Sequence, residues 1–165
     1  MLEERNLCQA ICLFKDSFIF VSGGYNMRSV ERYDIGNDKW ELMPDLTEER
    51  WYHASVVQGG TVYVLCGFNG SCDLDDLESL DTAQLASGGA RWQRIRIATA
   101  VLTPREQPVA ASLNDREIVI LGGAHDGYYL DDVVIVDAKE LICSDSGQLK
   151  VRFRAEQNIN FTLNF

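Results

Sequence analysis

The sequence has few histidines and no long apolar run. Its 165 residues include only His53 and His125, which excludes most zinc and copper sites built on several imidazoles. No apolar stretch approaches the roughly 20 residues that a membrane-spanning helix requires. Sustained helical periodicity is also absent, and one short turn around residues 81–85 is the only helical candidate. These absences favour a protein built from strands, and we expect no metal and no cofactor.

Basic residues are outnumbered, since 15 Lys and Arg face 25 Asp and Glu for a formal net charge of −10. Nucleic acids and anionic membranes attract clustered Lys and Arg, so we expect neither as a partner. The five cysteines lie mostly in apolar runs, without zinc or thioredoxin spacing, and are interpreted as reduced thiols. Two acidic residues precede the first apolar run of the chain, so the N-terminus does not resemble a secretory signal. We therefore expect a cytoplasmic location.

Three apolar runs end in the same way, each on glycine: VSGG at 21–24, VLCG at 64–67 and ILGG at 120–123. Placing Gly67 on Gly123, an offset of 56 (123 − 67), aligns LDDL at 74–77 with LDDV at 130–133. Upstream, LTEERWYHASVV at 46–57 parallels LTPREQPVAASL at 102–113. We expect a single domain of three repeats, at about 4–43, 46–97 and 102–154, followed by a tail at 155–165.

Each repeat is expected to form four short strands, because apolar runs alternate with turn residues. The expected strands are 9–14, 17–22, 29–34 and 39–42 in the first repeat, 53–58, 61–66, 76–81 and 91–96 in the second, and 108–113, 116–121, 132–137 and 148–154 in the third.

This pattern resembles the kelch repeat. The landmarks are glycines ending the second strand, Tyr-Asp in the third strand, Trp in the fourth, and Arg-x-x-His before the first. They fall on Gly23, Gly24, Tyr33 and Trp40 in the first repeat, Arg50, His53, Gly67 and Trp92 in the second, and Gly122 and Gly123 in the third. A repeat length near 50 agrees with the family. Leu80 and Val136 replace the family's Tyr, and Phe153 its Trp; we interpret these as packing variants.

The resemblance implies an all-β fold of three four-stranded antiparallel kelch-type β-propeller blades in an incomplete ring. Blades pack face to face, so their middle strands should be buried on both faces. Glycine permits a sharp turn with close backbone approach where the second strand reaches the rim. Tryptophan should cover the gap between adjacent sheets.

Three blades do not close a propeller, which typically needs 4 to 8. Three explanations are open: the chain is part of a longer propeller, it associates with itself or another chain, or the tail at 155–165 starts a further degenerate blade. We favour the first explanation, a fragment or the product of a truncated gene, whose exposed apolar faces would make it prone to association.

Loops at one rim are the expected binding surface, because aromatic and charged residues there have the composition of contact hot spots. These residues are Tyr25, Arg50, Trp51, Tyr52, Phe68, His125, Tyr128 and Tyr129. His53 is interpreted as structural. The acidic run 73–81 lacks the glycine and closing Glu of a calcium loop. No nucleophile elbow, Walker loop or Rossmann fingerprint is present, so we expect no enzyme.

The main hypothesis is a protein-interaction module. By resemblance, it would be the substrate-recognition part of a larger ubiquitin-ligase adaptor, or a cytoskeletal binder. The alternatives are a kelch-fold enzyme of the galactose oxidase or sugar-isomerase kind and a nonfunctional propeller fragment.

Overall fold

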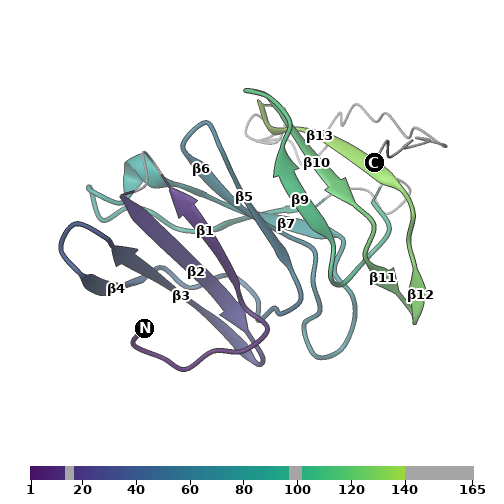
Figure 1. Ribbon diagram of the computed structural model, residues 1–165, viewed down its shortest axis with the longest axis horizontal. Helices are drawn as coiled ribbons and strands as arrows, with labels where there is room; N and C mark the ends of the chain where they lie inside the picture. The colour runs from purple at the N-terminus through teal and green to yellow at the C-terminus, as the bar shows by residue number, and fades with distance from the viewer. Residues whose placement is uncertain (14–16, 97–101, 140–165) are drawn as a thin grey trace, which may run out of the picture.

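The computed structural model describes residues 1–13, 17–96 and 102–139, whose strands form antiparallel sheets (Figure 1). The only helical element with defined bounds among these residues is the 3-10 turn Thr82–Gln84, in agreement with the expected turn. Among the same residues, no helix has both the length and the apolar character needed to cross a membrane. The all-β fold class is confirmed.

The first two sheets have four strands each, in sequence order. Blade 1 contains β1 (Gln9–Leu13), β2 (Phe18–Gly24), β3 (Met27–Asp34) and β4 (Lys39–Met43). Blade 2 contains β5 (Ala54–Gln58), β6 (Thr61–Leu65), β7 (Asp76–Asp81) and β8 (Gln93–Arg96). These bounds agree with the expected strands to within about two residues at each end.

Blade 3 is described in part. Its strands β9 (Val109–Ser112), β10 (Glu117–Leu121) and β13 (Val133–Asp137) pair in the order β13-β10-β9. Between β10 and β13 the chain forms a small hairpin of β11 (Ala124–His125) and β12 (Tyr128–Tyr129). The sequence did not lead us to expect this hairpin. The strand expected at 148–154, with Phe153, and the tail at 155–165 lie outside the described residues.

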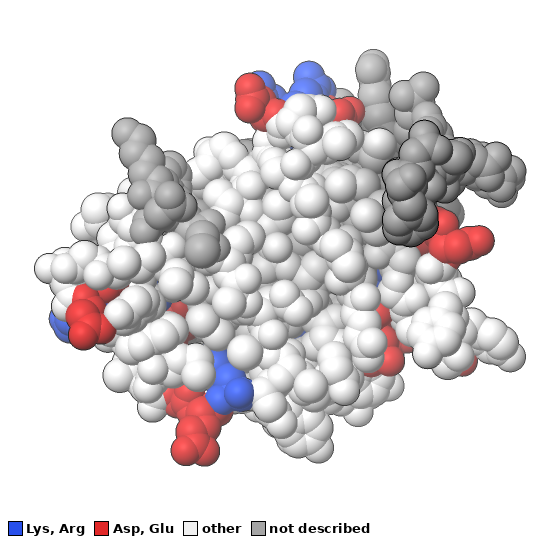
Figure 2. Space-filling model, viewed as in Figure 1, with Lys and Arg blue, Asp and Glu red and all other residues white. Residues whose placement is uncertain are grey.

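Blade 2 lies between the other two, because β5 contacts both β1 and β9 (Figure 1). Its middle strand β6 is buried along its whole length. Val62 and Val64 belong to the core shared with blade 1, and Tyr63 and Leu65 to the core shared with blade 3. The middle strand is therefore buried on both faces, as expected for stacked blades. Figure 2 shows few charged side chains over β1, β5 and β9.

Trp92 fills the joint between blades 1 and 2. It is buried in their shared core immediately before β8, and its indole N–H donates to the carbonyl of Pro44 at 2.9 Å. Trp40 lies at the matching position of blade 1, where it is half-buried and its ring centroid is 5.0 Å from that of Tyr33. Trp92 thus covers the gap between two sheets, as the resemblance implies.

A buried arginine holds each blade together at the rim. The Arg50 guanidinium is fully buried and donates to the Cys66 carbonyl at 2.8 Å, to Asp76 at 3.1 Å and to Glu78 at 2.8 Å. It therefore joins the end of β6 to the acids of β7. A buried charge requires such pairing, since unpaired it would be strongly destabilising.

The same contact recurs in the other two blades. Arg105 donates to the Gly122 carbonyl at 2.9 Å and to both carboxylate oxygens of Asp132 at 2.7 Å. Arg5 donates to the Gly23 carbonyl at 2.9 Å and to Glu31. Each arginine precedes the first strand of its blade, which makes the contact a repeated feature of the fold.

The turn at the end of the second strand is left-handed in all three blades. Gly23, Cys66 and Gly122 have φ values of 58°, 58° and 53°. A Cβ on Gly23 would collide with the Arg50 carbonyl oxygen and lie 2.9 Å from His53 Cε1. β6 ends at Leu65, one residue earlier than expected, and leaves Cys66 outside the strand.

His53 joins blades 1 and 2 from a fully buried position just before β5. Its Nε2 lies 3.0 Å from the Ser22 hydroxyl of blade 1. Burial, followed by the nearby Arg50 charge, lowers the pKa of His53 to about 3. The imidazole is therefore neutral near pH 7 and lies between the two blades.

The crowding at Gly23 leads to a stability prediction. We expect Gly23→Ala to lower the free energy of unfolding by about 2–4 kcal/mol, the sum of a left-handed alanine and an overpacked contact. Gly59→Ala is the matched control, because Gly59 has φ 56° with no atom near its Cβ position; it should cost only about 1 kcal/mol. Urea unfolding of both variants measures the difference. Equal losses would show that the contact with Arg50 and His53 is not tight.

The pKa of His53 makes stability depend on pH in a defined direction. The unfolded imidazole takes up a proton below about pH 6.5, whereas the folded one does so only near 3, so stability falls as pH falls between these values. Between about pH 7.5 and about pH 5 this loss should be about 2 kcal/mol. Urea unfolding at the two pH values should show that His53→Gln reduces the loss. An unchanged pH dependence in His53→Gln would contradict this prediction.

Candidate functional site

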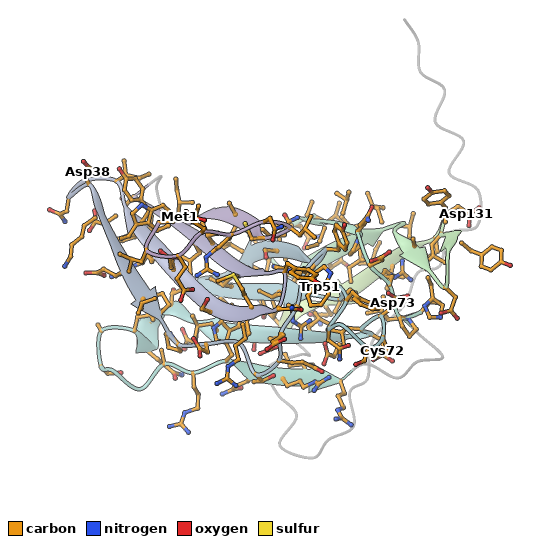
Figure 3. The ribbon with its side chains drawn as sticks, turned by 90° about the horizontal axis from the view of Figure 1, so that it is seen from below. Met1, Asp38, Trp51, Cys72, Asp73 and Asp131 are labelled. Atoms are coloured by element: carbon orange, nitrogen blue, oxygen red, sulfur yellow. The ribbon has the colours of Figure 1, made fainter. Side chains whose placement is uncertain are left out.

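A hollow of about 470 Å³ opens at the rim where blades 2 and 3 meet. We call it the rim hollow. It is lined by Phe68, Ser71, Cys72, Asp73, Pro104, Glu106, His125, Asp126 and Gly127. These residues come from the β6–β7 loop, the segment entering blade 3 and the β11–β12 hairpin. Figure 3 looks onto this rim and shows Cys72 and Asp73 close together, with Trp51 nearer the middle of the molecule.

Backbone pairing holds the loops around the hollow in place. Trp51 and Phe68 exchange two hydrogen bonds, at 3.1 and 2.9 Å, and Phe68 also bridges to Asp73. Glu106 and Ala124 exchange another two, at 2.9 and 2.8 Å. The lining side chains are therefore carried on loops with fixed backbone partners.

The β11–β12 hairpin extends the rim on the blade 3 side. Asp126 and Gly127 form its turn with φ values of 49° and 80°, the positive pair typical of a two-residue type I′ hairpin. The hairpin places Tyr128 and Tyr129 at the surface, where they are 76% and 93% exposed.

His125 connects the two sides of the hollow. Its Nδ1 lies 2.8 Å from Asp73 Oδ2 in blade 2, and its Nε2 lies 3.6 Å from Asp126 Oδ2. Ligand atoms of these three residues lie within 4.8 Å of one another, close enough to surround a cation. However, each ring nitrogen faces a different carboxylate, so one metal ion could not replace both contacts. The arrangement fits an imidazole that bridges two acids.

The rim hollow is acidic. Three carboxylates line it, those of Asp73, Glu106 and Asp126, and its lining includes no Lys or Arg. Burial, followed by the nearby charge of Asp73, raises the pKa of Glu106. This shift means that negative charge on Glu106 is incompletely compensated. A cationic group placed in the hollow would relieve that repulsion.

Aromatic residues form the adjoining part of the rim. The Trp51 ring centroid lies 5.1 Å from that of Tyr25 in blade 1 and 5.4 Å from that of Phe68. Tyr25 is 54% exposed, while Trp51 is buried beneath it. The cluster thus offers the faces of Tyr25 and Phe68 beside the acidic hollow.

The expected contact residues divide into two groups. Tyr25, Phe68, His125, Tyr128 and Tyr129 lie at the rim surface or in the hollow, and Tyr52 is half-buried between them. Arg50 and Trp51 are wrong as surface contacts, because the Arg50 side chain is enclosed by its ion pairs and Trp51 is 5% exposed. Both support the rim from below.

Cys72, Asp73 and Asp126 lie in the rim loops 67–73 and 123–129, which the sequence marks as binding segments, although these three residues were not singled out. Glu106, on the segment entering blade 3, was not expected in the hollow. The Asp-Gly pair at 126–127 is the signal that could have located the hairpin.

Comparison with known proteins agrees with the repeat architecture. Residues 19–47 match the model of the Kelch motif. The chain is 26% identical to human Kelch-like protein 6 over 126 residues, 76% of this chain and 19% of that protein. It is 29% identical to mouse Kelch-like protein 35 over 133 residues, 79% of this chain and 21% of that protein.

A viral protein is also similar. The Kelch repeat protein M-T8 of Myxoma virus (strain Lausanne) is 28% identical over 124 residues, 73% of this chain and 22% of the viral protein. The chain thus spans about a fifth of the length of these relatives. The family-model match, these relatives and the three antiparallel sheets with their recurring glycine turns together support a kelch-repeat architecture for the chain.

Proposed function

We propose that the chain is a protein-interaction module that binds a segment of a partner protein at the rim hollow. The observation that carries this proposal is the hollow itself, an acidic depression of about 470 Å³ lined in part by Phe68, with the exposed Tyr128 and Tyr129 on the hairpin strand paired with His125. Concave sites with an aromatic border and a few convergent polar groups are typical of recognition sites.

The partner segment should carry a positive charge. The lining described for the hollow includes His125 but no Lys or Arg beside Asp73, Glu106 and Asp126, so a lysine or arginine side chain would gain charge-assisted hydrogen bonds there. The overall charge of −10 would also favour approach of a basic partner. Tyr25 and Tyr128 could then contact residues on either side of the cation.

A module of this kind would work in the cytoplasm as the recognition part of a larger assembly. The family resemblance suggests the substrate-recognition part of a ubiquitin-ligase adaptor, or a cytoskeletal binder. Its two outer blade faces would be covered either by further blades of a longer chain or by another copy of the chain.

A kelch-fold copper oxidase is less well supported. Such a site would use both histidines, yet His53 is enclosed between blades 1 and 2 beside Ser22, while His125 is bonded to Asp73 in the rim hollow. They have separate surroundings and no shared ligand. A protein-recognition site does not require either histidine to act on a substrate.

Peptide selection tests the proposal. A random peptide display library is selected on the immobilised chain, and enriched peptides are measured against Asp73→Asn/Asp126→Asn. We expect the enriched peptides to contain lysine or arginine and to bind the double variant about tenfold or more weakly, because it lacks two of the three carboxylates. Added salt should weaken binding to the unaltered chain.

The matched control is Glu4→Gln/Asp115→Asn, which removes the same two negative charges from exposed positions outside the hollow. This control should bind like the unaltered chain. Enriched peptides without cationic residues, or equal losses in the two double variants, would refute recognition at the hollow.

A further inference from the structure

Blades 2 and 3 contain the same backbone pair at the rim. In blade 2, Trp51 and Phe68 exchange hydrogen bonds of 3.1 and 2.9 Å. In blade 3, Glu106 and Ala124 exchange hydrogen bonds of 2.9 and 2.8 Å. In each blade the first residue of the pair directly follows the buried arginine, and the second directly follows the last glycine of the rim turn. Trp51 and Glu106 therefore occupy equivalent positions, although one is aromatic and the other acidic.

Trp51 closes the rim where blades 1 and 2 meet. The Tyr25 N–H of blade 1 donates to the Asn6 carbonyl at 3.1 Å, which makes Tyr25 the counterpart of Phe68. The Trp51 ring centroid lies 5.1 Å from that of Tyr25, and Trp51 is buried. The indole thus fills the space between the entry segment of blade 2 and the rim turn of blade 1.

Glu106 leaves the corresponding space open where blades 2 and 3 meet. Phe68 of blade 2 takes the position of Tyr25 in this second joint, and Glu106 of blade 3 takes the position of Trp51. Both line the rim hollow of about 470 Å³. A carboxylate side chain is smaller than an indole, and its charge favours contact with a cation or with water over packing against a ring. The hollow therefore lies where a planar ring fills the preceding joint.

Two carboxylates of the hollow have oxygen atoms available to a ligand. His125 Nδ1 and the Asp126 N–H approach the same oxygen of Asp73, Oδ2, at 2.8 and 3.4 Å. Within the part of the chain that the structure describes, Asp73 Oδ1 and the Glu106 carboxylate have no hydrogen-bond partner. After burial, the charge of Asp73 is the cause of the raised pKa of Glu106. The two carboxylates are therefore close enough to act on one cationic group.

We propose that the rim hollow is a pocket for an arginine side chain of the partner and that it selects arginine over lysine. The planar guanidinium would take the place that corresponds to the Trp51 indole and would stack on the Phe68 ring. Its N–H groups would donate to Glu106 and Asp73. Arginine selection rests on the proposed function, and adds which cation is recognised and which residues select it.

The chemistry of the two cations explains the preference. A guanidinium presents its N–H donors in a planar fork, so it can stack on an aromatic ring while it donates to carboxylates at its edge. Charge-assisted hydrogen bonds of this kind are among the strong ones in proteins. A lysine ammonium is compact, strongly hydrated and without a planar face. It would gain the attraction of the acids but not the stacking on Phe68.

Two peptide display libraries test the preference on the immobilised 165-residue chain. One has arginine at a fixed central position and the other has lysine there, with neither residue elsewhere. The arginine library should enrich, and replacing the arginine of an enriched peptide by lysine should weaken binding about tenfold. Equal enrichment with equal affinities would overturn arginine selection and leave recognition of a cation standing. Enrichment of neither library would overturn both.

Phe68→Leu tests the stacking, because it removes the ring and keeps an apolar side chain. The preference for the arginine peptide over its lysine form should fall to about twofold, with the lysine peptide bound as before. Tyr25→Leu is the matched control, since Tyr25 is an aromatic rim residue outside the lining of the hollow; it should keep the full preference. Equal weakening of both peptides by Phe68→Leu would mean that the ring only supports the rim.

Glu106→Trp tests the equivalence of the two joints by placing in the hollow the residue that closes the other one. The variant should lose binding of the arginine peptide and keep a cooperative thermal transition. Glu106→Gln removes only the charge and should weaken binding about tenfold, whereas Glu4→Gln, at an exposed position outside the hollow, should not. Unaltered binding by a folded Glu106→Trp, or by Glu106→Gln, would contradict the proposal.

Discussion

The buried arginine at the entrance of each blade is the interaction on which the rest of the structure depends. Its guanidinium joins the second-strand turn to acids on or just before the third strand of its own blade, and in blades 2 and 3 its backbone joins that blade to the one before. Arg50, for example, binds Asp76 through its side chain and Gly24 through its carbonyl. Because a buried cation is costly without its acids, the position of the side chain is tightly determined. The backbone joint is thereby determined as well.

This constraint explains where the glycine pairs can vary. The Arg50 carbonyl and the His53 ring crowd Gly23 from the next blade, and no side chain fits. At the following joint, Pro108 stands in the position of His53 and presents no imidazole to the first residue of the pair. That residue is Cys66, which keeps the left-handed turn at φ 58° and is buried in the core between blades 2 and 3. Cys66 in place of the first glycine and Pro108 in place of the histidine thus occur at the same joint.

Much of the fold could be predicted from the sequence, because strands buried on both faces leave continuous apolar runs and rim turns leave glycines. The pairing of each arginine with an acid was missed, although Arg5 and Glu31, and Arg50 and Asp76, are each 26 residues apart. Arg50 was assigned to the surface because a charged residue beside aromatics resembles a contact site. Only the packed structure shows that its partners enclose it.

The rim hollow could not be predicted in the same way, because it belongs to no single repeat. Asp73 is on a loop of blade 2 and His125 on a hairpin of blade 3, 52 residues later in the chain, and periodicity says nothing about how loops of adjacent blades meet. The hollow forms because the joint brings these loops together. It follows that the shape of the rim hollow and the stacking of the blades are coupled. A residue such as Arg105, whose carbonyl accepts from Gly67 and whose side chain holds Asp132, supports both at once. A substitution that weakens the contact between blades 2 and 3 would therefore deform the hollow even if every lining residue were left unaltered.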